Sequence, residues 1–530
     1  MITARTLILS SAAGLMALSG AQAADLPVKA KAVEYVRICS LYGAGFFYIP
    51  GTDTCIKLGG YLRADVTFGG GTHGAPAWNG DLGQRNRYMD NYVARSRMAL
   101  TVDTRTATEY GVVRTFGQGD FQFNNIGGGT VNPSVLTAAG VNSNLLNTAG
   151  GGYVAVEYLF IQFAGFTFGK SSSAYSTPWN GFPGNINSSL LGGNNTDTGV
   201  NNIQYTAEFG NGVSASIGLD DPQVWNRTAV YNLGIPSAIG VNGTGSNAYA
   251  GVHTPDIVGR IRVDQAWGLF QLSAAAHEVN ASYNTLGAGA VPNSLSEISG
   301  HPESKWGGSV MAALNIKNLP TGAGDDIKID VSYAKGTTKN VIATSGGSPN
   351  FAMFGGSGFG YQSVGFGATT DGVYMPGAAG TGGIVLTTAW GVRGAFNHNW
   401  NPYWSTSLFG SYSSVRYDGG ADDNLLGAGT TSAKGAYCAA FAASHAGQTG
   451  VAGVGTYSCN PDFNVSQLGV VTRWTPVKNL TFSGEVQWFH LDQKMSGSSV
   501  FTATAPKPNA LYEFKDQNTV LLQLRAQRNF

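Results

Sequence analysis

The sequence predicts an all-β fold: a sixteen-stranded antiparallel transmembrane β-barrel with short periplasmic turns and long external loops. Three observations predict it. Runs of residues alternate between polar and apolar side chains over lengths that suit a membrane-crossing strand. The connectors between these runs are alternately long and short, as in an up-and-down barrel with two unlike ends. Glycine accounts for 76 of the 530 residues, and charged residues make up only 12%, about half their share in soluble domains.

The alternating runs supply the expected strands. In the run from Lys57 to Phe68, Arg63 and Asp65 share one face, and Leu62 and Val66 share the other. The runs are about 9–13 residues long, whereas strands of soluble proteins average about 5–6 residues. Alternation alone leaves open which face points outward. The expected strands are 57–68, 91–103, 109–121, 152–163, 165–173, 200–209, 212–220, 254–265, 269–278, 303–315, 325–336, 384–396, 402–416, 462–475, 479–491 and 517–530.

The connectors distinguish the two ends of the barrel. The long ones are 69–90, 122–151, 174–199, 221–253, 279–302, 337–383, 417–461 and 492–516. The short ones include Asn211-Gly212, a strong hairpin signal between two alternating runs. Sixteen strands leave an aqueous lumen. The long connectors are rich in Gly, Ser, Asn, Thr and Ala, which predicts solvated loops rather than separate domains.

Residues 1–23 have the features of a secretory signal peptide. Arg5 is the only charged residue in this stretch, an apolar run extends from Leu7 to Leu18, and Ala21-Gln22-Ala23 has the small-x-small cleavage pattern. The remaining residues, 24–530, are expected to form a single barrel domain whose first strand begins at about residue 57.

Four cysteines, Cys39, Cys55, Cys438 and Cys459, are expected to form disulfides, because an even number in an exported protein favours pairing. Four cysteines allow three connectivities. The two local pairings, Cys39 with Cys55 and Cys438 with Cys459, are the simplest. The sequence has no C-x-x-C motif, so zinc or thiol redox chemistry is not expected.

Composition argues against several classes of function. The formal net charge is zero, so a nucleic-acid partner is not expected. Hydrophobic residues make up 43% of the chain, which argues against disorder. The stretch Gly69–Gly74 matches G-x-G-x-x-G but precedes an irregular loop rather than a helix, so dinucleotide binding is not expected. We therefore expect no catalytic residues, no metal and no cofactor.

Two N-terminal segments carry a resemblance to a known family. Asp25–Ala30 and Val36–Arg63 resemble the mature N-terminus of the alphaproteobacterial outer-membrane porins; beyond about residue 70 the resemblance is one of layout. It implies a homotrimer of sixteen-stranded barrels, integral to the lipid of a Gram-negative outer membrane. It further implies that the third long loop, about Ser171–Gly199, folds into the lumen, and that ions and small polar solutes diffuse through passively. The terminal Phe530 looks like the assembly signal of outer-membrane barrels.

Charged residues on the polar strand faces are the candidates for lining the pore, because charged groups beside an ion path act as selectivity groups. These candidates are Arg63, Asp65, Arg95, Arg97, Arg260, Arg262, Asp264, Lys328, Asp330, Arg473, Glu485 and Arg525, with Asp197 in the third loop. Their basic excess predicts a mildly anion-preferring or weakly selective pore. The alternative is a structural or adhesive outer-membrane barrel with a closed lumen.

Overall fold

The computed structural model describes most of the chain beyond the N-terminal segment. The described residues are 37–70, 75–78, 85–87, 91–124, 153–179, 183–184, 189–195, 198–222, 226–235, 238–344, 347–376, 382–419, 432–445, 456–502 and 507–530. The expected signal peptide, 1–23, lies outside them.

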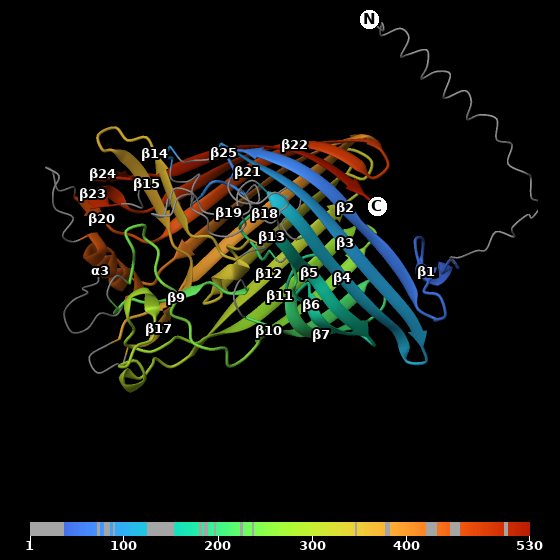
Figure 1. The fold of residues 1–530 in the computed structure, drawn as a ribbon, viewed down its shortest axis with the longest axis horizontal. Coiled ribbons are helices and arrows are strands. Elements are labelled where there is room, and N and C mark those ends of the chain that lie inside the picture. The colour runs from blue at the N-terminus through green and yellow to red at the C-terminus, as the bar shows by residue number, and fades with distance from the viewer. Residues whose placement is uncertain are drawn as a thin grey trace, which may run out of the picture.

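The main body is a closed antiparallel barrel (Figure 1). Its sheet has seventeen strands, and without the two-residue β1 (Phe47–Tyr48) sixteen remain. The barrel strands are β2 (Cys55–Phe68), β3 (Tyr92–Thr108), β4 (Gly111–Asn124), β5 (Tyr153–Phe163), β6 (Phe166–Ser171), β7 (Val200–Glu208), β8 (Val213–Asp220), β10 (Asp256–Gln265), β11 (Gly268–Val279), β12 (Lys305–Lys317), β13 (Asp326–Lys335), β18 (Thr388–Asn401), β19 (Trp404–Arg416), β21 (Phe463–Val477), β22 (Leu480–Gln493) and β25 (Gln517–Asn529). The predicted strand number is confirmed.

The first and last strands close the barrel. β2 pairs with β25 in antiparallel register, with Tyr61 opposite Asn529 and Phe68 opposite Leu522. Phe530 continues this pairing, since its backbone exchanges hydrogen bonds with Gly60. Closure removes free sheet edges, which is the condition for a sheet to cross a bilayer.

The strand faces have inverted polarity relative to a soluble protein. On β2, Asp65 and Thr67 are 4% and 0% exposed, whereas Leu62 and Phe68 on the opposite face are 53% and 45% exposed. The same arrangement recurs around the wall, with exposed Leu159, Ile217, Ile261, Leu408 and Leu524. The polar faces therefore point into the barrel and the apolar faces point outward, which suits a lipid-facing wall.

The short turn between β7 and β8 requires glycine for two reasons. Between β7 and β8, Gly210, Asn211 and Gly212 all have positive φ, at 80°, 50° and 72°. A Cβ at Gly212 would lie 1.9 Å from the backbone oxygen of Asp264 on β10. Only glycine fits this position, because it meets both the turn geometry and the close approach of the neighbouring strand.

The long connectors build structure of their own at one end of the barrel (Figure 1). One five-stranded sheet contains β14 (Phe351–Gly355), β15 (Gln362–Gly367), β24 (Asn509–Phe514), β23 (Ser496–Thr502) and β20 (Tyr457–Ser458). A three-stranded sheet contains β9 (Ala229–Asn232), β16 (Thr370–Tyr374) and β17 (Ile384–Leu386). Helix α3 (Ala433–His445) and the 3₁₀ turns η6 (Ala288–Ala290), η7 (Glu297–Ser299) and η8 (Thr338–Asn340) lie in the same connectors.

These connectors form a packed layer, so the prediction of simple solvated loops was wrong. Their side chains share an apolar core with the ends of several barrel strands. Its largest buried members include Tyr231, Phe351, Phe441 and Tyr512 of the connectors and Phe463 of β21. The sheets join strands from different connectors; for example, β15 pairs in parallel with β24. Each connector contributes only one or a few short strands, and therefore no single connector has the pattern of a domain. We call this assembly the loop layer.

Both local disulfides are present. Cys39, just before the 3₁₀ turn η1 (Ser40–Tyr42), bonds to Cys55 at the start of β2, with 6.1 Å between their Cα atoms. Cys438 on α3 bonds to Cys459 after β20, with 5.7 Å between their Cα atoms. The simplest of the three possible connectivities is confirmed. Among the described residues, no helix is long and apolar enough to cross a membrane.

Candidate functional site: the lumen

The third long loop folds into the barrel, as expected. Gln271 of β11 donates a hydrogen bond from its Nε2 to the backbone oxygen of Ser176 (3.0 Å). Further round the wall, Gln467 of β21 donates to the oxygen of Ser189 (2.9 Å) and accepts from the backbone N–H of Leu191 (2.8 Å). Glutamine suits this role, because one side chain offers both a donor and an acceptor to a passing backbone.

Other contacts hold the same loop against the wall. The indole Nε1 of Trp179 donates to Asp330 of β13 (3.3 Å), and Arg473 of β21 donates to the backbone oxygen of Pro183. Leu190 packs in a small apolar cluster with Phe409 and two other wall residues. The described parts of the loop thus line the wall from β11 to β22, which narrows the lumen on that side.

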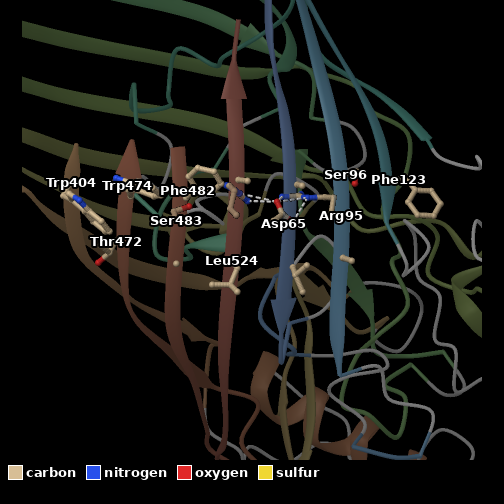
Figure 2. A pocket seen from close by; sticks show the side chains of 16 residues that line it. Asp65, Arg95, Ser96, Phe123, Trp404, Thr472, Trp474, Phe482, Ser483 and Leu524 are labelled. Carbon is tan, nitrogen blue, oxygen red and sulfur yellow. Dashed lines mark hydrogen bonds and ion pairs between the residues drawn. The ribbon is translucent and has the colours of Figure 1, made fainter. Parts of the chain in front are cut away.

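Four arginines gather on the strands that close the barrel, β25, β2 and β3. We call Arg63, Arg95, Arg97 and Arg525 the arginine ladder. Asp65 lies among them and accepts from Arg95 Nη2 (2.7 Å), as Figure 2 shows. It also accepts from Arg525 Nη2 (3.0 Å). The register explains the cluster, because Asp65 is directly opposite Arg95 on one side and Arg525 on the other.

The other two members of the ladder, Arg97 and Arg63, differ in whether a carboxylate neutralises them. Arg97 donates to Asp120 of β4 (2.7 Å) and lies 3.7 Å from Glu157 of β5. Arg63, opposite Arg97 in the β2–β3 register, donates from Nε to the amide oxygen of Gln527 (2.8 Å). Within the described part of the chain, no carboxylate lies within 4.0 Å of the Arg63 guanidinium. The ladder therefore presents net positive charge to the lumen, across the barrel from the loop-lined strand β11.

The remaining predicted wall residues occupy varied surroundings. Asp330 forms a buried ion pair with Arg393 of β18 (2.9 Å), and Lys328 pairs with Asp326 on its own strand. Asp264 pairs with Lys317 (3.2 Å) and is half exposed.

Three more of the predicted residues are on the lumenal face, and one cannot be placed. Arg262 donates to the amide oxygen of Gln271 from Nε (2.9 Å) and Nη2 (2.7 Å). Arg260 lies next to it on the same face of β10, and buried Glu485 lies beside the loop near Gly184. Asp197 lies outside the described residues.

The predicted set of pore-lining candidates leaves out several charged lumenal residues. They are Asp103, Arg105, Arg114, Asp120, Glu157 and Arg393. Parity along each strand could have found Arg114 and Asp120, which share a face of β4. The weak alternation of that strand hid the signal, because Phe116 interrupts its polar face and three glycines interrupt the opposite, apolar face.

A buried polar network ties the loop layer to the barrel rim. The carboxylate of Asp371 in β16 accepts from the backbone N–H groups of Thr228 (3.0 Å) and Thr338 (2.7 Å) and from the hydroxyl of Tyr249 (3.0 Å). The same hydroxyl is 2.9 Å from Nε2 of His277 on β11. The network fixes two connectors, the one between β8 and β10 and the one between β13 and β18, and one barrel strand relative to one another.

Lys339 of η8 lies beside this network and is buried. Burial lowers the pKa of its ammonium group, while the nearby carboxylates of Asp256, Asp220 and Asp371 oppose that shift. Its ammonium donates to the amide oxygen of Asn226. The side chain therefore acts as a buried cross-link between connectors rather than as an exposed charge.

Two adjacent apolar hollows lie on the outer wall behind the arginine ladder. The first, of about 690 Å³, has small residues such as Ala64 and Gly484 at its floor and Trp404, Trp474 and Phe482 along one side. Figure 2 shows these three aromatic side chains in a row on neighbouring strands. The second hollow, of about 790 Å³, shares Ala64 and continues over β4 and β5.

Comparison with known proteins identifies the family. Residues 25–522 match the model of the family described as "Porin subfamily". The chain belongs to this porin family. The match extends over the barrel strands up to residue 522, and it includes the third loop and the connectors of the loop layer.

Individual relatives support this assignment. The porin is 35% identical over 267 residues to Porin Omp2b of Brucella abortus, and the match covers 50% of this chain and 63% of the relative. Porin Omp2b of Brucella melitensis is 35% identical over 268 residues with the same coverage. The aligned part thus spans slightly less than two thirds of these curated relatives. The porin is an integral protein of the outer membrane.

A solved structure shares the fold. The outer membrane channel DcaP of Acinetobacter baumannii superposes with a TM-score of 0.54 at 14% identity, covering 91% of this chain and 99% of that one. At this identity the likeness concerns the fold alone. Within the described part of the chain, no group of three or more His, Cys, Asp or Glu side chains could hold a metal ion.

Proposed function

We propose that this porin is a passive aqueous channel for ions and small hydrophilic solutes, and that it has no enzymatic activity. The observation that carries the proposal is the inverted polarity of the wall. Charged and amide side chains such as Arg63, Asp65 and Gln527 face the lumen, and large apolar side chains face outward. Sixteen strands enclose enough space for water, and a polar wall keeps permeating ions solvated.

Liposome swelling tests passive diffusion directly. Vesicles that contain the purified porin are placed in isotonic solutions of neutral sugars of increasing size. The proposal predicts fast swelling for small sugars and a steep loss of rate with size. A correctly folded barrel that admits none of them would support the alternative of a structural or adhesive barrel with a closed lumen.

We further propose a mild preference for anions. Its support is the arginine ladder, where Asp65 bonds to Arg95 and Arg525, Asp120 bonds to Arg97, and Arg63 has no carboxylate within 4.0 Å among the described residues. Fixed positive charges attract anions into a narrow path and repel cations. The reversal potential in a KCl gradient measures this preference, and a value near the potassium equilibrium potential would contradict it.

We also propose that the porin is a homotrimer and that the paired outer hollows form the subunit contact. Family resemblance supports the trimer, and the apolar lining of the hollows supports the location. Small residues at membrane interfaces let helices or strands approach closely, while the surrounding aromatic rings supply contact area. A neighbouring copy would fill the hollows better than lipid chains.

A matched pair of variants tests this contact. Ala64→Trp fills the shared part of both hollows, whereas Ala274→Trp adds the same bulk to the outer face of β11, on the opposite wall. We expect the first variant to shift the purified protein from trimer to monomer in light scattering, and the second to remain trimeric. If both variants remain trimeric, the subunit contact lies elsewhere on the barrel. If the wild-type protein is itself monomeric, the proposed trimer is wrong.

A further inference from the structure

Three aromatic side chains lie on the lumenal face of β4 and β5, where a water-filled barrel ordinarily carries polar residues. The rings of Phe116 and Phe160 stack with centroids 5.3 Å apart, and Tyr158 meets Phe116 edge-on at 6.4 Å. All three are only partly buried. They line a hollow of about 350 Å³ that opens from the lumen between β4 and β10.

A bulge brings these rings together. The β4–β5 register shifts after Gln118, so that Gln118 lies opposite Tyr158 while Gly119 lies opposite Val156. Glu157 is the extra residue. The shift turns Tyr158 and Phe160 to the lumenal side, opposite the polar and aromatic residues of β4. Bulges of this kind re-aim side chains at functional positions.

One edge of the hollow carries a guanidinium that is only partly neutralised. Arg114 lies over the rings of Phe116 and Phe160, at 5.2 and 5.6 Å from their centroids. It shares the carboxylate of Asp103 with Arg105, at 3.0 and 3.1 Å respectively. Two positive groups on one negative group leave an excess of positive charge.

The facing edge carries Arg260 of β10. Its Nε is buried without a hydrogen-bond partner, and no carboxylate lies within 4.0 Å of its guanidinium in the described part of the chain. The charges of Arg262 and Glu208 act on it electrostatically, with opposite signs. Its cross-strand neighbours Ser216 and Ser273 are small, which leaves the guanidinium accessible from the hollow.

We propose that this hollow binds a small monocarboxylate that carries a flat apolar ring, and that it slows the passage of such a solute through the lumen. The ring would stack on Phe116 and Phe160, and the carboxylate would pair with Arg260 in a charge-assisted hydrogen bond. None of the described residues that line the hollow carries a carboxylate, so an anion meets no like charge from them. This proposal rests on the channel function proposed above.

The ring and the carboxylate of the ligand contribute separately to binding. A carboxylate without a ring leaves the aromatic surface in water, and a ring without a charge leaves Arg260 unpaired. Benzoate combines both features, acetate lacks the ring, and benzyl alcohol lacks the charge. These three compounds therefore serve as probes.

The experiment measures block of the chloride current through the purified porin in a planar bilayer. Benzoate is expected to reduce the current at concentrations at least about tenfold lower than acetate or benzyl alcohol. Arg260→Gln should raise the half-blocking concentration of benzoate at least about tenfold, and Phe160→Leu about fivefold. Arg37→Gln and Phe168→Leu are the matched controls, because they make the same changes outside the lumen.

The outcomes separate this inference from the channel proposal. A wild type that conducts no KCl defeats the channel function. A wild type that conducts KCl but responds equally to all three probes overturns only the ring-carboxylate site, and equal effects of Arg260→Gln and its control place the site elsewhere. Calorimetric titration of benzoate into the detergent-solubilised porin is a second readout, since it needs no ion flow.

Discussion

The substitution Asp65→Asn tests the arginine ladder most sharply. Asp65 is 4% exposed and accepts from both Arg95 and Arg525. The amide keeps the shape but removes the negative charge, which leaves two buried guanidiniums without their shared partner. Breaking a buried ion pair in this way costs about 3 kcal/mol of folding free energy, and the aqueous lumen reduces that cost.

The same change alters ion selectivity. One unit charge about 7 Å from an ion's path changes the ion's energy by about 0.6 kcal/mol in water, a factor of about 2.7 in its local concentration. The ratio of chloride to potassium permeability should therefore rise at least about twofold. Reversal potentials in a KCl gradient measure it, with Asp53→Asn as the control, because Asp53 is exposed outside the wall. An unchanged ratio in a folded Asp65→Asn barrel would refute the placement of the ladder beside the ion path.

Three further predictions concern folding and assembly. Gly212→Ala should slow barrel formation, measured by heat-modifiable mobility in gels, more than Gly210→Ala, because only the first places a Cβ against a neighbouring strand. Serine at both Cys438 and Cys459 should destabilise α3 by about 3 kcal/mol and expose the loop layer to limited proteolysis while the barrel stays intact. Deletion of Phe530 should lower the yield of folded barrel in the outer membrane, because it removes the residue that continues the β25–β2 pairing.

Much of the barrel was predictable because each strand carries its own signal. In β2, β13 and β22 the alternation is local, so the presence of the strands follows from consecutive residues. The loop layer was not predictable for the opposite reason. β15 finds its partner in β24, more than a hundred residues away, and neither segment alternates in a way that reveals the pairing. Short strands that pair across distant connectors leave no local pattern.

The lumenal site was likewise predictable only in part. Parity placed Arg63, Asp65, Arg95 and Arg525 on polar faces, and the structure finds them on the lumenal side. Which of them touch depends on register between strands at opposite ends of the chain, and parity carries no information about register. The aromatic rings beside Arg114 escaped notice because the bulge at Glu157 breaks the alternation that would have assigned Phe160 a face.

Channel function depends on an open aqueous path through the barrel, bordered by the arginine ladder. Single-channel recording of the purified porin in a planar bilayer tests it most directly, with different KCl concentrations on the two sides. An open path with net positive charge gives ohmic conductance steps with a reversal potential displaced toward that of chloride. Folded barrels that insert into the bilayer and pass no current would contradict it and would indicate a closed lumen.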